Sequence, residues 1–156
     1  RIAILGLPPL LLILAATGTV PAAPLPAAAV WAGLAVALTG FATVVLAQRG
    51  MGTSWRIGMD PTERTALITG GPFAIVRNPI FTAMSTALAG LVVATPTVLT
   101  AAGLVCLVVA VQLQVRVVEE PYLLATHGKT YAAYAARVGR FVPGAGRLHT
   151  SNPVVR

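Results

Sequence analysis

Hydrophobic residues fall into four long runs along the chain, at residues 2–20, 27–47, 79–94 and 97–118. A helix needs roughly 20 residues to span the ~30 Å of hydrocarbon in a bilayer. The third run is shorter than the others, so its Pro79 end is expected at the membrane interface or inside the protein. The pattern predicts an all-α integral membrane protein with about four transmembrane helices.

The connections between the runs predict how the helices pair. Residues 95–97 are so few that the third and fourth runs should form a tight antiparallel hairpin, and the proline-broken residues 20–26 should join the first two. Residues 48–78 form a long polar connection, and residues after 143 lack apolar periodicity. We therefore expect three units. They are a transmembrane hairpin that acts as scaffold (1–48), a functional core with a C-terminal helix (49–143) and a mobile tail (144–156).

Composition supports the membrane class, and the charges predict an orientation. The chain is 56% hydrophobic and 10% charged, whereas soluble domains have about 25% charged residues. Its net charge is +7, and every Lys and Arg except Arg1 lies in the 48–78 connection or after residue 115. With four spans, these two regions share one side, which the positive-inside rule makes cytoplasmic. We expect a protein of the bacterial plasma membrane, surrounded by lipid, with both termini and the functional site in the cytoplasm. A nucleic-acid partner is not expected, because the cations do not form a patch with exposed aromatic residues.

Two carboxylates directly follow the fourth run. Glu119 and Glu120 are among only four acidic residues in the chain, and a carboxylate close to hydrocarbon is costly unless it is paired, so it indicates function by default. Arg116 would lie on the same face of a continuing helix, which makes a local ion pair an equally good interpretation. Pro121 predicts that the helix ends or kinks at the glutamates.

A second feature is a stripe of apolar and aromatic residues after Pro121. Its members recur at spacings of three and four, which predicts an amphipathic cytoplasmic helix: Leu124, His127, Tyr131, Tyr134, Val138 and Phe141. The stripe indicates either a helix lying at the membrane interface or one wall of a ligand pocket.

The stretch GGPFAIVRNPIF, residues 70–81, places a glycine turn and Arg77 at the start of the third run. Arginine can bind a carboxylate through two parallel hydrogen bonds, or it can anchor a span on the cytoplasmic side.

Other chemistries find little support in the sequence. The two histidines lack Cys or acidic residues at ligand spacing, so no metal site is expected. Cys106 lies within an apolar run and has no partner cysteine.

Together these residues resemble the isoprenylcysteine carboxyl methyltransferase family and the related phospholipid methyltransferases. One block is GPF-x3-RNPIF, and the other, after an apolar hairpin, is EE-x2-L-x4-G-x2-Y-x2-Y-x3-V-x-R-x-x-P. The resemblance covers residues 52–143 and implies an integral-membrane enzyme that uses S-adenosyl-L-methionine. Two positions depart from the family pattern, because Asn78 replaces a histidine and Phe81 a tyrosine. Asparagine can bind a ligand by hydrogen bonds but cannot act as a base at neutral pH.

The resemblance also implies which residues form the site. Arg77 and Glu120 are the expected catalytic residues. The implied cofactor-binding residues are Gly71, Pro72, Phe73, Val76, Arg77, Asn78, Pro79, Phe81, Glu119, Glu120, His127, Tyr131 and Tyr134. In this interpretation Arg77 and Asn78 meet the methionine carboxylate or the adenosine end, the glutamates face the amino group or the sulfonium, and the tyrosines stack on adenine. Methyl transfer from a sulfonium requires an in-line approach rather than a protein nucleophile.

The methyl acceptor and some rival functions stay open. The acceptor should be small and apolar or lipid-like, with O-methylation of an isoprenylcysteine carboxylate favoured by the resemblance. N-methylation of a phospholipid and S-methylation of a small thiol are alternatives. Outside the methyltransferases, a non-catalytic membrane protein with the same fold or a small transporter subunit would also fit. Cofactor binding and turnover separate these classes. The sequence does not indicate the oligomeric state.

Overall fold

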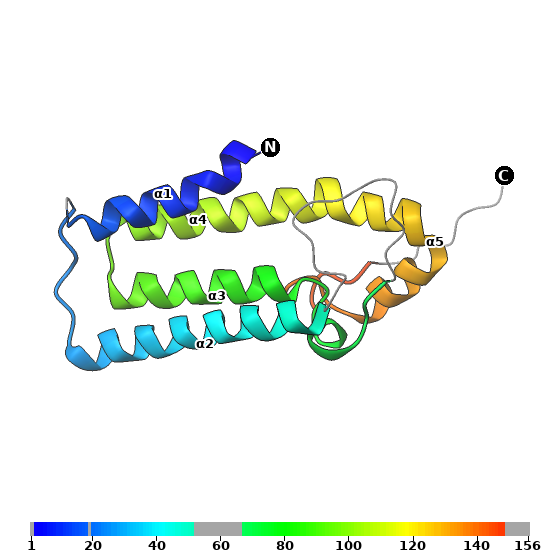
Figure 1. Ribbon diagram of the computed structural model, residues 1–156, viewed down its shortest axis with the longest axis horizontal. Helices are drawn as coiled ribbons and strands as arrows, with labels where there is room; N and C mark the ends of the chain where they lie inside the picture. Colours follow the sequence, from blue (N-terminus) through cyan, green and yellow to red (C-terminus); the bar gives the residue numbers. More distant parts are fainter. Residues whose placement is uncertain (1, 19, 52–66, 149–156) are drawn as a thin grey trace.

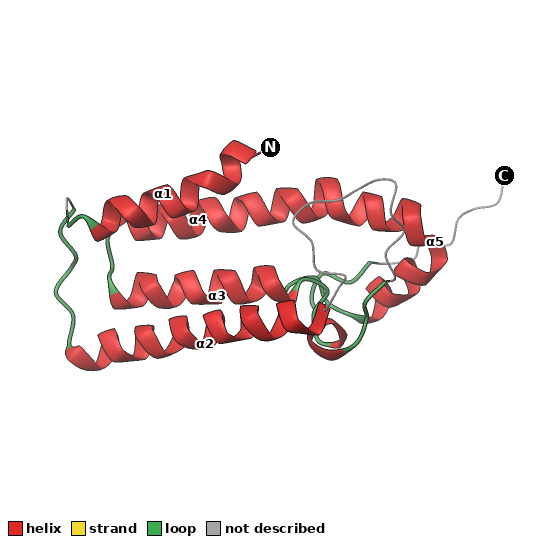
Figure 2. Ribbon diagram, viewed as in Figure 1, coloured by secondary structure: helices red, strands yellow, loops and turns green. Residues whose placement is uncertain are grey.

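The structure is a computed structural model that describes residues 2–18, 20–51 and 67–148 (Figure 1). Every regular element in these residues is helical, as Figure 2 shows, so the predicted all-α fold is confirmed. Four helices form an elongated bundle, and a fifth lies at one end of it. They are α1 (Ile2–Ala16), α2 (Ala27–Met51), α3 (Pro79–Ala94), α4 (Val98–Leu113) and α5 (Glu120–Arg137).

Helices α2 and α3 pack with their backbones in close approach, because small residues face each other along the seam. A Cβ atom added to Gly33 would lie 2.5 Å from the backbone nitrogen of Ala94, and one added to Gly40 would lie 2.5 Å from that of Ala87. Small residues at such a seam are typical of helices that associate within membranes. Any larger side chain at these glycines would force the two helices apart.

The helix pairing differs from the predicted one at the N-terminus. Helix α1 packs against α4, and α2 packs against α3, so the first two helices lie on opposite sides of the bundle (Figure 1). The first two runs therefore do not form a packed hairpin of their own. The small-residue seam favours the α2–α3 pair, and hydrophobic periodicity carries no such information. The predicted connection of α3 to α4 through residues 95–97 is confirmed.

Two helical stretches within the described residues are long and apolar enough to cross a membrane. They are Ala27–Gly50 and the stretch Val98–Arg137, which is kinked at Gly128, while Pro79–Ala94 is apolar but shorter. Helix α2 also exposes large apolar side chains, including Trp31 and Phe41, and exposed apolar surface of this kind marks contact with a membrane or a partner. The membrane class is thus supported, and the total of about four spans stays a prediction.

The chain does not end or bend sharply at the glutamates. Helix α4 continues into a π-helical segment, Gln114–Glu119 (η3), and then directly into α5. In the wider turn the Glu120 N–H bonds the carbonyl of Val115, five residues earlier. Pro121 lies in the first turn of α5, directly after the π-helical segment. The break comes instead at Gly128, with φ 50° and ψ −124°, a backbone conformation that glycine adopts readily.

The predicted amphipathic stripe is therefore interrupted. Tyr131 and Tyr134, beyond the break, are buried, whereas Leu124, before it, is 39% exposed. The helix ends at Arg137, so Val138 and Phe141 belong to the following segment. The regular spacing crosses two helical pieces and a loop, and the prediction of one continuous helix is wrong.

Residues 138–148, which we name the C-terminal strap, fold back onto the start of α3. Val76 and Gly139 form a parallel backbone bridge, and the Leu148 N–H donates to the Ala135 carbonyl at 3.0 Å. Residues 144–148 are thus held by the fold, in contrast to the mobile tail expected from residue 144. The rest of that expected tail, and residues 52–66 of the 48–78 connection, lie outside the described residues. Figure 1 shows the start of α3, helix α5 and the strap gathered at one end of the bundle.

Candidate functional site

A buried group of charges lies where α3, α5 and the strap meet. It consists of Arg77, Glu120 and Arg140, which we name the arginine–glutamate cluster. Glu120 Oε1 lies 2.9 Å from Arg77 Nη1 and 2.8 Å from Arg140 Nε, and Oε2 accepts from Arg140 Nη2 at 2.9 Å. Arg140 thus binds the carboxylate through two hydrogen bonds, a geometry that gives strong charge-assisted interactions. Arg77 and Glu120 are each only 6% exposed.

The cluster carries one more positive charge than negative, because two guanidiniums share one carboxylate. The hydrogen bonds to the Glu120 carboxylate raise the pKa of Arg140 above its usual value and outweigh the opposing effect of burial. Removing one member of a buried ion pair leaves an uncompensated charge, which is strongly destabilising. The cluster is therefore expected to stabilise the packing of three separate segments of the chain against one another.

Arg77 has further partners and one atom without any. Its Nη1 donates to the Tyr131 hydroxyl at 3.1 Å and its Nη2 to the Gly146 carbonyl at 2.7 Å. The guanidinium carbon lies 6.0 Å from the centre of the Tyr131 ring, within the range of a cation–π interaction. The Nε atom is buried and has no hydrogen-bond partner among the described residues. An unpaired buried donor is rare enough to require an explanation.

The strap is bonded to the start of α3 mainly through backbone groups. The Arg77 N–H donates to the Gly139 carbonyl at 2.8 Å. The Asn78 N–H and its Nδ2 both donate to the Arg140 carbonyl at 3.1 Å. Thr82 Oγ1 lies 2.9 Å from the carbonyl oxygen of Phe141. Asn78, at the position of the family histidine, therefore fastens the strap that carries Arg140.

The two buried tyrosines connect α5 to the glycine turn. The Tyr134 hydroxyl donates to the Phe73 carbonyl at 2.6 Å. Phe73 lies in a short 3-10 helix, Gly71–Ala74 (η2), which Gly71 enters with φ +58°. The rings of Tyr131 and Tyr134 have centres 6.1 Å apart and are tilted by 59°. These contacts bring parts of both sequence blocks together.

Glu119 lies apart from the cluster contacts. It is half-buried, and its Oε1 is 3.5 Å from Gln114 Nε2, a five-residue spacing that a π-helical turn aligns. Arg116 is exposed and donates from Nε to Gln112 Oε1 at 2.9 Å. Within the described residues Arg116 forms no ion pair with either glutamate, so the structure does not support the local ion pair that was one of the two interpretations of the sequence. The π-helical winding changes the register on which that prediction rested.

A cavity of about 260 Å³ lies between α2, α3 and the strap. We name it the apolar groove. Pro72, Val76 and Pro79 of the predicted set line it, together with Phe141 and Pro143 of the strap. The charged residues of the cluster do not line it. Residues 72–79 therefore border two environments, the charged cluster and the apolar groove.

The structure places the rest of the predicted set less centrally. Phe81 packs against the apolar core that α3 shares with α4, beside Leu88 and Leu107. Gly71 is exposed and His127 is half-buried, and neither has a hydrogen bond to the cluster among the described residues. Arg140 was absent from the predicted set, although the spacing V-x-R-x-x-P marked its position. Gly146, which contributes only a carbonyl oxygen, had no signal in the sequence.

Similarity to known proteins indicates the family to which the chain belongs. Searches of curated proteins and of solved structures found no significant match. A family model described as phospholipid methyltransferase matches residues 28–130, well over half of the chain. Proteins of this family are methyltransferases associated with membranes, and they generally use S-adenosylmethionine. The match includes Arg77 and Glu120 but ends before Tyr131 and the strap. Two long apolar helices, the paired sequence blocks and this match lead to one conclusion: the chain belongs to the phospholipid methyltransferase family.

Proposed function

We propose that the protein transfers a methyl group from S-adenosyl-L-methionine to a small apolar or lipid-like acceptor, and that the arginine–glutamate cluster binds the carboxylate end of the cofactor. The observation that most strongly supports this proposal is the charge and the hydrogen bonding of Arg77. Its guanidinium is buried in a cluster with one excess positive charge, and its Nε donor has no partner among the described residues.

The groups present fit the chemistry of this cofactor. A carboxylate would satisfy the unpaired Arg77 donor and the excess charge, in the charge-assisted geometry that arginine favours. The Tyr131 ring lies beside the Arg77 guanidinium and Tyr134 lies next to Tyr131, so both aromatic side chains would be near the end of the cofactor that the cluster holds. When bound, the cofactor supplies an activated methyl group. The contribution of the chain is to hold and orient it, which is the main requirement for this transfer.

The two glutamates take different roles in this proposal. Both oxygens of Glu120 accept hydrogen bonds from Arg140, and Oε1 also pairs with Arg77, so Glu120 is already paired and does not face the cofactor directly. Glu119 has only a long contact to the Gln114 amide among the described residues. We therefore assign Glu119, rather than Glu120, to the amino group or the sulfonium of the cofactor.

The apolar groove supports an apolar or lipid-like acceptor. It lies next to residues 72–79, and prolines, valine, threonines and phenylalanine dominate its lining. The favoured reaction is O-methylation of an isoprenylcysteine-type carboxylate. An ionised carboxylate needs no base, and Asn78 cannot serve as one. N-methylation of a phospholipid amine is the second candidate, and the family match favours it. In either case the proposal places about four spans in the membrane and the cluster at the cytoplasmic surface, where the polar segments gather.

Binding of S-adenosylmethionine to detergent-purified protein, measured by calorimetry, tests the proposal. Replacing Arg77 by glutamine should weaken binding about 10- to 100-fold, as expected for losing a charge-assisted hydrogen bond. Arg137→Gln is the matched control, because Arg137 is exposed at the end of α5. Equal affinity of Arg77→Gln and the parent protein would refute the site. Absence of binding by the parent protein at millimolar cofactor would refute the function.

A further inference from the structure

We propose that Arg140 is a positioning residue of this site. It holds the Glu120 carboxylate so that Arg77 keeps a positive charge available to an anionic group. The inference rests on the proposed function and deepens it. It concerns a residue of the strap, which lies beyond the segment that matches the family model.

The backbone of Arg140 is fixed on both sides. Its N–H donates to the Ala145 carbonyl at 2.8 Å, and its carbonyl accepts two hydrogen bonds from Asn78. The preceding residue must be glycine, because a Cβ at Gly139 would collide with the carbonyl oxygen of Val142. The tight loop therefore presents the Arg140 side chain in one direction, toward Glu120.

The side chain makes a matched two-bond contact. Its Nε and Nη2 bond the two different oxygens of Glu120, at 2.8 and 2.9 Å, whereas Arg77 reaches Glu120 through Nη1 alone. Arg140 is thus the principal partner of the carboxylate by geometry. Among the described residues, this division leaves the Arg77 Nε without a hydrogen-bond partner and without a counter-charge beside it.

The role of Arg140 follows from the net charge of the cluster. With Arg140 present, the cluster of two guanidiniums and one carboxylate has a net charge of +1. Without Arg140, Glu120 would neutralise Arg77, and the pair would have no net attraction for an anion. If Glu120 also lost its charge, Arg77 alone would restore the +1. A residue that only stabilises the fold would not show this reversal, since removing two partners would be worse than removing one.

The experiment measures binding of S-adenosylhomocysteine by calorimetry, because this product keeps the carboxylate and undergoes no turnover. Arg140→Gln should weaken binding about tenfold or more. The double variant Arg140→Gln/Glu120→Gln should return to within about threefold of the parent protein, and Arg140→Lys, which keeps the charge, should do the same. Arg137→Gln serves as the control, and circular dichroism with gel filtration checks folding.

The outcomes separate the two proposals. If the parent protein does not bind the probe, the proposed function and the role of Arg140 both fail. If the parent binds and Arg140→Gln binds equally well, only the role of Arg140 fails. Binding by the double variant that is tenfold weaker than the parent also overturns the role. This last comparison stands even if the single variant does not fold.

Discussion

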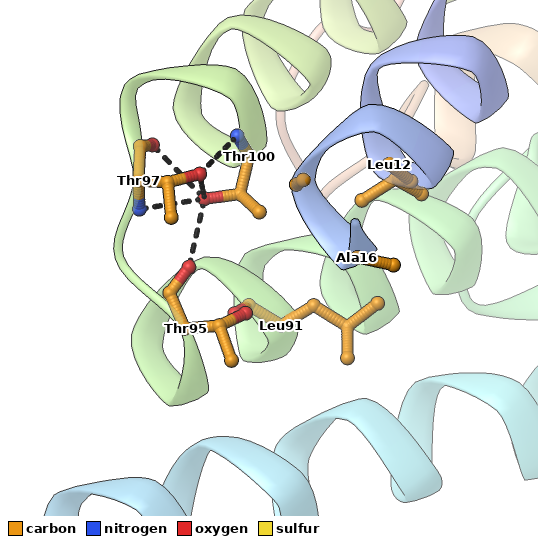
Figure 3. A pocket seen from close by; sticks show the side chains of 7 residues that line it. Leu12, Ala16, Leu91, Thr95, Thr97 and Thr100 are labelled. Carbon is orange, nitrogen blue, oxygen red and sulfur yellow. Dashed lines mark hydrogen bonds between the residues drawn. The ribbon is translucent and has the colours of Figure 1, made fainter. Parts of the chain in front are cut away.

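The two ends of the helical bundle satisfy polar groups in different ways. At the end away from the strap, Thr97 caps α4, and its Oγ1 accepts from the Thr100 N–H at 3.0 Å while Thr100 Oγ1 accepts from the Thr97 N–H at 3.0 Å. Thr100 Oγ1 also lies 2.9 Å from the Thr95 carbonyl oxygen (Figure 3). This capping box is neutral, and its side chains all have partners. At the other end, the arginine–glutamate cluster has an excess charge, and the buried Arg77 Nε has no partner in the part of the chain that the structure describes.

Each end also has a cavity of about 260 Å³, so size does not distinguish them. The cavity beside the capping box is lined by Leu12, Leu91 and small residues of α1 together with the threonines (Figure 3). None of the described residues that line this cavity is charged. The comparison shows that the polar network, rather than the hollow, indicates which end can bind a charged ligand. Substitutions at each end of the bundle test whether only the charged end can bind a charged ligand.

The largest effect is expected from Glu120→Gln. The substitution keeps the shape of the side chain but leaves two guanidiniums around a neutral amide. Losing one member of a buried ion pair costs about 3–5 kcal/mol, and we expect that range for the free energy of unfolding, measured by SDS titration or thermal circular dichroism. Glu119→Gln is the matched control, because Glu119 has no arginine partner among the described residues. A loss no larger than that of the control would mean that the cluster contributes little to stability.

A smaller effect is expected from Gly139→Ala. The added methyl group would collide with the carbonyl of Val142 inside the strap. Overpacking of this kind costs about 1–3 kcal/mol, and the displaced strap should also weaken binding of S-adenosylhomocysteine. Gly70→Ala is the control, since Gly70 has φ −95° and open space around its Cβ position. Unchanged ligand affinity in a destabilised Gly139→Ala protein would separate the strap from the site.

Much of this arrangement could be predicted from the sequence, and the reason is that apolar runs and motifs are local signals. The third run coincides with helix Pro79–Ala94. Arg77 and Glu120, 43 residues apart in the chain, were both assigned to one site by the resemblance, and the structure brings them to 2.9 Å. Both signals come from side chains whose chemistry or hydrophobicity is visible in the sequence.

The remaining features depend on contacts that leave little trace in the sequence. The strap is held largely by backbone groups, such as the Gly146 carbonyl that accepts from Arg77, and any residue supplies such a group. The π-helical turn shifts the register between Arg116 and the glutamates. No residue type in the sequence indicates such a turn. The break at Gly128 had a signal in the glycine itself, but regular spacing on both sides of it favoured a continuous helix.

The smallest effect is expected at the opposite end of the bundle, from Thr97→Ala. The variant removes the side chain that caps α4 and should reduce the free energy of unfolding by about 1 kcal/mol, the usual contribution of an N-cap. Thr97→Ser keeps the hydroxyl and is the control. Binding of S-adenosylhomocysteine should not change in either variant, because the capping box has no charge to offer and lies at the far end of α4 from Glu120. If Thr97→Ala weakened ligand binding more than the Arg137→Gln control does, the two ends would be coupled, and the assignment of binding to the charged end alone would be wrong.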